Sequence, residues 1–329
     1  EADAGRGYKL LYGPGDGSGM YAAFSPDGES WKLCDENPVV PRRATGDTCS
    51  VMRDPASGKY WLYHKVRTPS RPIRMIARME SDDFVHWEPR RLVLAPDAFD
   101  PPDTQFYGMS AFPYAGQYLG LLWVYHTYAG SLDVQVVSSR DGLSWDRTAD
   151  RKLFMHLVPT NEYHGEAFDS VQIYPSTVPV EKDGKLWLYY CGLKVPHNTL
   201  AVDQDARIGL ATFRIDGFCS FDATSPGHVV TRPFTCNGSQ LLVNAATSGP
   251  NPELASGGGV RVQIEDEEGQ PIPGFTASDC TPFCGDETDA VMQWRGRNDL
   301  SELVGRVVQL RFEIEATNLY SYRLGDQRT

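Results

Sequence analysis

The sequence predicts an all-β protein, in which repeated four-stranded units form a β-propeller and a small antiparallel β-sandwich follows. A turn motif recurs along the chain, aromatic β-rich segments recur upstream of it, and the pattern stops near residue 224. The 329 residues include 31 glycines and 23 prolines, and 11% are aromatic. That composition is typical of many short strands joined by turns. We therefore expect a propeller domain over residues 1–223 and a sandwich domain over residues 224–329.

The turn motif reads Ser-x-Asp-Gly-x-Ser-Trp. It occurs at residues 25–31 and 139–145, with a looser copy at 81–87 and a worn copy at 214–221. Its tryptophans are 56 and 58 residues apart, at Trp31, Trp87 and Trp145. That spacing is slightly longer than the roughly 40–50 residues of familiar blade repeats. Because Gly accepts positive φ, Asp-Gly favours a tight turn between two strands. We expect each Trp to start an outer strand and to pack between blades.

Two further elements complete each unit. Aromatic strands are predicted at residues 8–12, 59–64, 118–126 and 185–190, the last three after the turn glycines Gly58, Gly116 and Gly184. Each unit starts with an acid and a hydroxyl residue that lead into a strand: Asp47-Thr48, Asp103-Thr104 and Asp169-Ser170. This gives four strands per unit, as in a propeller blade. Three complete units span about residues 45–223, and the first unit begins at its second strand. Either upstream sequence or distant strands must then complete the ring.

After residue 224 the pattern changes to that of a sandwich. Residues 260–264 and 308–314 alternate between apolar and polar side chains, which predicts antiparallel strands. Residues 266–269 predict a hairpin turn, and residues 299–303 a single helical turn. Together these features favour a small antiparallel β-sandwich.

The charge and the apolar runs exclude several classes of partner. Lys and Arg number 31 against 43 Asp and Glu, so the formal charge is −12. An acidic protein is a poor match for nucleic acid or for an anionic membrane surface, since both favour a basic face. The longest apolar run, residues 119–125, is far shorter than the ~20 residues of a membrane helix. No secretory signal is expected at the first residues, which are acidic.

The seven cysteines do not form a recognisable metal or redox motif. Their odd count leaves at least one thiol free, and no spacing is Cys-x-x-Cys. Free buried thiols are expected, with a local disulfide between Cys280 and Cys284 as the further option. No His lies near that pair to complete a zinc site. We predict neither a metal site nor a cofactor.

The repeated Ser-x-Asp-Gly-x-x-Trp turns, the acids before the first strands and the trailing sandwich resemble the glycoside hydrolases of families 32, 43 and 68, and most closely family 32. The resemblance implies a five-bladed propeller, here incomplete, and hydrolysis of a furanoside or pentoside such as a fructoside or arabinoside. The family's Trp-x-x-Asp-Pro-Asn-Gly signature and its Glu-Cys are absent. Arg53-Asp54-Pro55 matches its Arg-Asp-Pro, but here it predicts a turn between the first two strands of a unit.

Four acids are the candidate catalytic residues. Glycoside hydrolysis needs one ionised carboxylate and one protonated carboxyl group on either side of the scissile bond. Acids at the start of the inner strands of a propeller converge on its centre. In this sequence the acids at such positions are Asp47, Asp103, Glu166 and Asp169. The resemblance implies base or nucleophile for Asp47, a pKa-tuning acid for Asp103 and general acid for Glu166, with Asp169 as the competitor of Glu166. The alternative is that a repeated Asp-Thr/Ser only caps each strand.

Five other residues are candidates for binding substrate: His64, Tyr107, His126, His164 and Arg78. His64 and His126 follow a Tyr at matching positions of their units and could also be packing residues. His164 precedes Gly165-Glu166 in a polar segment. Tyr107 and Arg78 could clamp a sugar or serve in packing.

Two other functions compete with a family 32-like glycosidase. A sialidase-type propeller carries Ser-x-Asp-x-Gly-x-x-Trp turns, whereas Asp and Gly adjoin here, and the sequence shows no obvious arginine triad. A non-catalytic carbohydrate-binding propeller would explain the missing first-blade signature. In each case the expected partner is a carbohydrate, the oligomeric state is open, and an extracellular or periplasmic location is expected.

Overall fold

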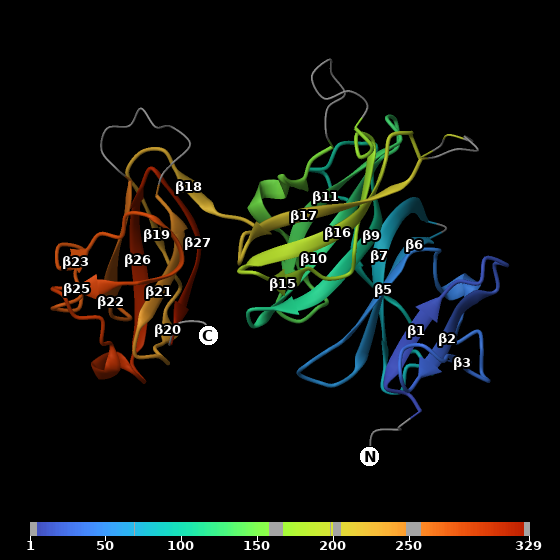
Figure 1. Cartoon of the computed structure of the whole chain (residues 1–329), viewed down its shortest axis with the longest axis horizontal. Helices are drawn as coiled ribbons and strands as arrows, with labels where there is room; N and C mark the ends of the chain where they lie inside the picture. Colours follow the sequence, from blue (N-terminus) through green and yellow to red (C-terminus); the bar gives the residue numbers. More distant parts are fainter. Residues whose placement is uncertain are drawn as a thin grey trace. The chain divides into compact units, whose positions relative to one another are not determined.

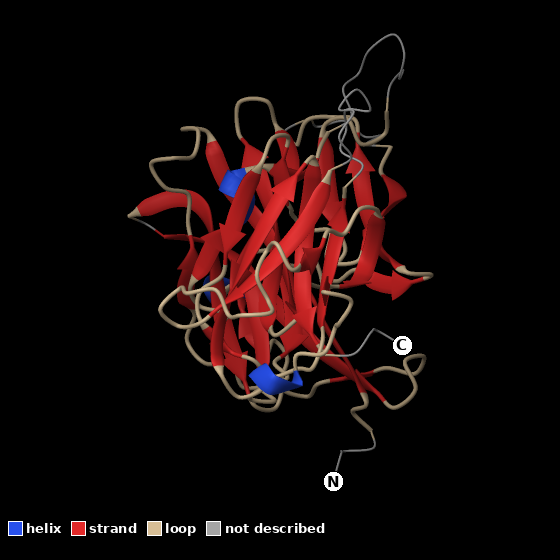
Figure 2. Cartoon of the chain, turned by 90° about the vertical axis from the view of Figure 1, so that its left-hand side faces the viewer, coloured by secondary structure: helices blue, strands red, loops and turns tan. Residues whose placement is uncertain are grey.

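The computed structural model describes residues 5–68, 70–157, 167–197, 199, 205–247 and 258–325. The chain folds into two compact units, residues 1–182 with 186–212 and residues 183–185 with 213–329. The described residues form strands, together with three short 3-10 turns, η1 (Arg42–Ala44), η2 (Thr148–Arg151) and η3 (Ser301–Leu303) (Figures 1 and 2). The all-β prediction is therefore confirmed. The expected domain boundary at residues 223/224 stays a prediction.

The first sheet of the N-terminal unit is small. Its strand order is β1-β2-β3, and β4 pairs with another segment of β2. The bounds are β1 (Tyr8–Tyr12), β2 (Gly19–Ser25), β3 (Lys32–Leu33) and β4 (Val40–Pro41). The pairing of β1 with β2 is antiparallel, with Tyr8 opposite Ser25. The strand predicted at residues 8–12 is confirmed.

The second sheet is one complete four-stranded unit. Its order is β5-β6-β7-β8, with every pair antiparallel. The bounds are β5 (Cys49–Arg53), β6 (Tyr60–Thr68), β7 (Arg71–Ser81) and β8 (Arg91–Leu94). The turn predicted at Arg53-Asp54-Pro55 joins β5 to β6, where the Gly58 N–H donates to the Asp54 carbonyl at 2.8 Å.

The next two units merge into one nine-stranded sheet. Strands β9, β10 and β11 form an antiparallel meander, and a parallel bridge between Leu132 and Gln172 links it to β14 and β16. The strands β12, β13, β15 and β17 flank this path. The bounds are β9 (Thr104–Tyr114), β10 (Gln117–His126), β11 (Ser131–Ser139), β12 (Trp145–Arg147), β13 (Leu153–Met155), β14 (Gln172–Pro175), β15 (Val180–Lys182), β16 (Lys185–Leu193) and β17 (Arg207–Arg214).

The recurrent turn motif is stabilised by its own side chains. In the third unit the Ser139 hydroxyl accepts from the Gly142 N–H at 2.8 Å, and Asp141 Oδ1 accepts from the N–H groups of Leu143 and Ser144 at 2.8 Å. Ser25 and Asp27 repeat this pattern in the first unit, and Ser81 and Asp83 repeat it in the second. The motif is therefore a side-chain-capped turn.

The looser copy places a phenylalanine where the others have glycine. Gly28 and Gly142 have φ of 82° and 68°, and Phe84 has φ of 72°. A bulky residue in this left-handed region costs about 1–2 kcal/mol. Phe84 is 2% exposed and makes an edge-to-face contact with Tyr60, with ring centroids 5.1 Å apart. Burial of this ring offsets the backbone cost.

The tryptophans of the motif differ in their packing. Trp145 starts β12, is 8% exposed and lies edge-to-face on Tyr63 of the second sheet, with centroids 5.6 Å apart. Trp31 is 42% exposed, and β8 begins four residues after Trp87. The expectation that each Trp packs between blades is thus wrong for Trp31, and none but Trp145 begins a strand. Trp145 is covered by Tyr63 of the second sheet, whereas the indole of Trp31 donates to the Gly28 carbonyl of its own turn at 3.0 Å.

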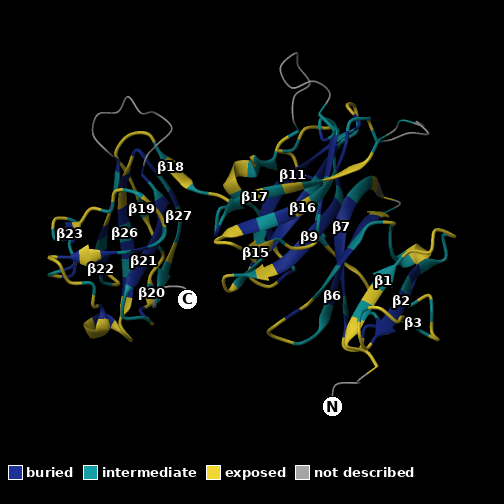
Figure 3. Cartoon of the chain, in the orientation of Figure 1, coloured by how far each residue is buried: buried dark blue, intermediate teal, exposed yellow. Residues whose placement is uncertain are grey.

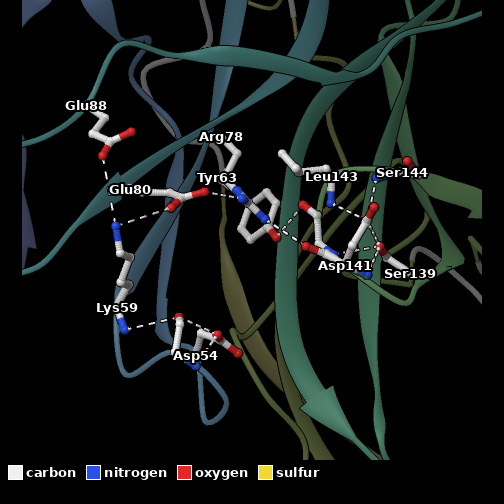
Figure 4. A network of polar contacts seen from close by, with 12 residues as sticks. Asp54, Lys59, Tyr63, Arg78, Glu80, Glu88, Ser139, Asp141, Leu143 and Ser144 are labelled. Carbon is white, nitrogen blue, oxygen red and sulfur yellow. Dashed lines mark hydrogen bonds and ion pairs between the residues drawn. The ribbon is translucent and has the colours of Figure 1, made fainter.

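A polar network joins the second sheet to the turn that follows β11 in the third sheet (Figure 4). The Tyr63 hydroxyl donates to the Gly142 carbonyl at 2.8 Å, and Arg78 donates to the Asp141 carbonyl at 3.0 Å. Arg78 is 4% exposed, forms an ion pair with Glu80 and lies 4.2 Å from the Trp61 ring centroid. These contacts fix one unit against the next through a turn of the motif.

Many of the buried side chains of the N-terminal unit lie on β6, β7, β9, β10 and β11, and others lie on β2, β14 and β16 (Figure 3). One apolar cluster joins the second and third sheets through Trp61, Tyr63, Phe106, Leu122 and Trp145. Another joins the first and second sheets through Met20, Val40, Leu62 and Met79. Each sheet therefore buries its faces against neighbouring sheets.

The C-terminal unit contains two four-stranded sheets and one two-stranded sheet. The orders are β18-β27-β21-β24, β19-β26-β20 with β22 on β26, and β23-β25. One hydrophobic core includes inward residues of both larger sheets, among them Val243, Val262, Phe312 and Leu319. The bounds are β18 (Phe221–Ala223), β19 (Gly227–Val230), β20 (Phe234–Thr235), β21 (Leu241–Ala246), β22 (Gly259–Glu265), β23 (Cys280–Thr281), β24 (Asp286–Val291), β25 (Gln293–Trp294), β26 (Val307–Glu315) and β27 (Thr317–Leu324).

All seven cysteines are free thiols in this structure. The optional bridge between Cys280 and Cys284 is therefore not formed. Cys280 is buried and its sulfur accepts from the Val262 N–H at 3.3 Å, whereas Cys284 is exposed.

Candidate active site

A cavity of about 710 Å³ opens in the N-terminal unit, and we refer to it as the basic cavity. It is lined by glycines that lie between β1 and β2 and at the start of β2, by residues in and after η1, and by side chains of β6, β7 and β9. Its polar lining among the described residues comprises Arg42, Arg43, Thr45, Asp47, Lys65, Arg67, Arg74, Arg90, Tyr107 and His197. Segments distant in sequence therefore supply one site.

Strand periodicity explains how β6 contributes to this wall. Successive side chains of a strand point to opposite faces, so Lys65 and Arg67 share the face that lines the cavity. His64, which directly precedes Lys65, belongs to the opposite face and is 1% exposed. Asp47 reaches the cavity from the segment just before β5.

Asp47 and Lys65 form the central ion pair. The Lys65 Nζ lies 2.6 Å from Asp47 Oδ1 and 3.7 Å from the Tyr107 ring centroid. The Lys65 side chain is 10% exposed, while that of Asp47 is 73% exposed. Lost hydration by itself raises the pKa of Asp47, but the hydrogen bond and charge of Lys65, with the charge of Arg74, lower that pKa below its usual value. Asp47 is therefore an ionised carboxylate at an accessible wall.

Arg74 lies within a group of aromatic rings. Its guanidinium carbon is 5.4 Å from the Tyr107 ring centroid and 4.9 Å from that of Tyr125. Its Nη1 donates to Gln105 Oε1 at 2.7 Å. Its Nε is buried and has no hydrogen-bond partner among the described residues. His197 packs edge-to-face on the Tyr107 ring, with centroids 4.8 Å apart.

The other described predicted acids have polar partners different from that of Asp47. Asp103 Oδ2 accepts from the Tyr128 N–H at 3.4 Å, and Asp169 is 8% exposed and accepts from the Tyr190 hydroxyl at 2.7 Å. Neither acid is among the described residues that line the basic cavity. Glu166 and His164 lie outside the described residues. The role of each acid stays a prediction.

The other predicted binding residues fall into different environments. Tyr107 lines the basic cavity. Arg78 belongs to the network between the second and third sheets. The His126 Nε2 lies 2.8 Å from Asp133 Oδ2, and that hydrogen bond raises the pKa of His126 despite its partial burial. Of the four described candidates, Tyr107 alone is in the cavity lining.

Sequence reasoning did not find the basic residues of the wall. Five arginines meet here from four segments: Arg42 and Arg43 in η1, Arg67 on β6, Arg74 on β7 and Arg90 before β8. The sequence showed no obvious arginine triad. These arginines become neighbours only when the chain folds and brings η1, β6, β7 and the segment before β8 together. The Lys65-Val66-Arg67 alternation at the end of the aromatic strand was the one local signal.

His64 gives a prediction about stability. Both ring nitrogens are buried without a hydrogen-bond partner among the described residues, and burial, then the charge of Arg90, lower the pKa of His64 to about 4. Between pH 6.5 and about 4 the unfolded chain therefore binds a proton that the folded chain does not. Acidification over this window should remove about 1.4 kcal/mol of stability per pH unit.

We expect His64→Leu to flatten this acid dependence, measured as the free energy of urea unfolding at a series of pH values. His156→Gln, at an exposed position, should retain the wild-type slope. An unchanged slope in His64→Leu would show that His64 is not the titrating group.

Neither a metal-binding cluster nor a membrane-spanning helix is found in the part of the chain that the structure describes. No group of three or more His, Cys, Asp or Glu side chains there could hold a metal ion. None of the helical segments in that part is long and apolar enough to span a membrane.

No protein-family model and no curated protein matches the chain. Similar solved structures include an N-acetylgalactosamine deacetylase from F. plautii in complex with blood group B trisaccharide, with 15% identity, 61% of this chain covered and a TM-score of 0.44. This chain spans 66% of that protein.

Two further similar structures extend over most of this chain. A family 32 β-fructofuranosidase from Bombyx mori in complex with sucrose has 11% identity, coverage of 97% of this chain and 77% of that one, and a TM-score of 0.42. A sucrose-6-phosphate hydrolase from Lactobacillus gasseri has 10% identity, coverage of 94% and 88%, and a TM-score of 0.43. Glycoside hydrolases, with a family 32 enzyme among them, are thus among the structures that this chain is similar to.

Proposed function

We propose that the protein is a glycosidase that cleaves a furanoside or pentoside at the basic cavity, with Asp47 as the ionised carboxylate that acts as nucleophile or base. The observation that carries this proposal is the Asp47–Lys65 pair, at 2.6 Å, on the wall of a cavity of about 710 Å³. Small-molecule sites are typically about 300–1,000 Å³. Tyr107 supplies an aromatic surface beside the pair, of the kind on which a sugar ring packs.

The remaining roles follow the sequence resemblance. Asp103 would tune the pKa of the acid, and Glu166 would donate the proton to the leaving oxygen, with Asp169 as its competitor. Two carboxyl groups about 5–10 Å apart are required across the scissile bond. In this proposal the repeated units of the N-terminal part are blades of a five-bladed propeller, the C-terminal unit is a β-sandwich, and the enzyme acts outside the cytoplasm.

The test is release of the aryl group from a panel of aryl furanosides and pentosides, with an aryl sialoside included. We expect turnover of at least one furanoside or pentoside, and its loss in Asp47→Asn. Turnover of the sialoside alone would support a sialidase-type enzyme. Absence of turnover on every sugar that the protein binds would contradict a glycosidase.

A carbohydrate-binding protein without catalysis is the second candidate. It is favoured by one observation: Asp47 is the sole carboxylate among the described residues that line the cavity. Equal affinity of the wild type and Asp47→Asn for a sugar that neither cleaves would support this candidate.

A further inference from the structure

The basic cavity is charged opposite to the protein as a whole. The chain has a formal charge of −12. Among the described residues, the cavity lining has six cationic side chains and one carboxylate, the cations being Arg42, Arg43, Lys65, Arg67, Arg74 and Arg90. Since Asp47 can neutralise one of these charges, the wall keeps an excess of positive charge in a concave site, where a field is focused.

The positive side chains that line the cavity lower one another's pKa values. Burial lowers the pKa of Lys65, and the charges of Arg74 and Arg67 lower it further against the effect of Asp47. Burial and then the charge of Arg67 lower the pKa of Arg74. The pKa of His197 is lowered by burial, and then by Arg74 and Lys65. Mutual repulsion of this kind is relieved when an anion enters.

Arg74 supplies an independent indication of a ligand. Its Nη1 is engaged by Gln105 at 2.7 Å, and Tyr107 and Tyr125 restrict its guanidinium plane. Its buried Nε has no acceptor among the described residues. A buried donor without an acceptor is unfavourable, and charged donors form the strongest hydrogen bonds with anionic oxygens. An oxyanion that reaches this guanidinium would satisfy it.

The glycine-rich segment before β2 makes room at the same wall. Gly13, Gly15, Gly17 and Gly19 all line the cavity. A Cβ atom added at Gly17 would lie 2.8 Å from Arg42 Nη1. The lack of a side chain at Gly17 therefore lets the backbone approach the Arg42 guanidinium without displacing it.

We propose that the arginine-lined wall of the basic cavity binds an anionic group, a phosphate, sulfate or carboxylate, that is carried by the carbohydrate substrate. This inference rests on the proposed function and specifies its substrate class. A cavity of about 710 Å³ accommodates a sugar together with its charged group, and an isolated inorganic ion would fill only a small part of it.

The test is calorimetric binding to the full chain with four probes: fructose, fructose 6-phosphate, galacturonate and inorganic phosphate. We expect one of the two charged sugars to bind at least about tenfold tighter than fructose. That preference should shrink as NaCl is raised, because salt screens the charges of an accessible wall. Arg67→Gln and Arg74→Gln should each weaken binding of the charged sugar by about tenfold or more, a loss typical of one charge-assisted contact. Arg140→Gln, at an exposed position outside the cavity, should bind as the wild type does.

Equal binding of fructose and both charged sugars would overturn the proposal, as would an unchanged preference in both arginine variants. Arg67 is exposed, so Arg67→Gln keeps the test informative if Arg74→Gln fails to fold. Binding of inorganic phosphate as tight as that of fructose 6-phosphate would overturn the assignment of the anion to the sugar.

None of these binding measurements requires that the protein cleave the sugar. A charged-sugar preference without cleavage would therefore contradict only the glycosidase, and cleavage of neutral sugars without this preference would contradict only the anion site.

Discussion

Asp47→Asn is expected to lower kcat on the best substrate of the panel by about 10²–10⁴-fold while the chain remains folded. The amide is nearly isosteric with the carboxylate but can neither attack the sugar as an anion nor take a proton from water. Wild-type Asp47 keeps its charge, because Lys65 and Arg74 hold the pKa of its carboxyl group below the usual 3.8. The measurement is kcat in parallel with thermal unfolding of both proteins.

The control for Asp47→Asn is Asp35→Asn, which changes an exposed carboxylate outside the cavity lining. It should leave kcat within about twofold of the wild type, since exposed substitutions of this kind have small effects. Loss of the Asp47 charge leaves Lys65 buried without its partner, so the unfolding curve shows whether a fall in kcat reflects chemistry or folding. A folded Asp47→Asn variant with wild-type kcat would remove Asp47 from the mechanism.

Gly142→Ala is expected to destabilise the N-terminal unit by about 3 kcal/mol or more. Gly142 has φ of 68°, where any side chain is strained. An added Cβ would also lie 2.7 Å from the Tyr63 hydroxyl and 2.8 Å from Arg78 Nη1, and would collide with the Trp61 ring. These groups are the network between the second and third sheets, so they cannot move without opening that contact. Urea unfolding measures the change.

Gly28→Ala is the matched control, because it tests the same turn without the collision. Gly28 has φ of 82°, and a Cβ there would meet only the ring of Tyr8 at 3.7 Å, an ordinary van der Waals contact. Gly28→Ala should therefore cost only the backbone strain, about 1–2 kcal/mol. Equal costs for the two variants would show that the inter-sheet network has little part in the stability of the unit.

Local patterns in the sequence predicted the elements, whereas the site depends on pairing between elements. The strands at residues 8–12 and 118–126 follow from their aromatic and β-rich composition, and the capped turns follow from neighbouring Ser, Asp and Gly residues. The Lys65–Tyr107 contact joins residues 42 positions apart, and it exists only because β6 and β9 are brought together. The exposure of Trp31 could not be foreseen for the same reason, since it depends on a neighbouring sheet rather than on the motif.

The acids show a similar limit. Asp47, Asp103 and Asp169 are each followed by a hydroxyl residue, and they differ in what surrounds them: Lys65 for Asp47, the Tyr128 N–H for Asp103 and the Tyr190 hydroxyl for Asp169. A shared position in a repeat therefore places an acid at the start of a strand without deciding whether it reaches a cavity. Burial and charge partners decide that.

Phe84 shows which parts of the repeated turn are essential. It adopts the backbone of the glycines at the same position, while Ser81 and Asp83 make the same hydrogen bonds as their counterparts. The hydroxyl and the carboxylate, rather than the absence of a side chain, therefore dictate the path of the chain. Related proteins are then better detected by the Ser-x-Asp pair than by Asp-Gly, because a copy that has exchanged its glycine for a core aromatic still folds in the same way.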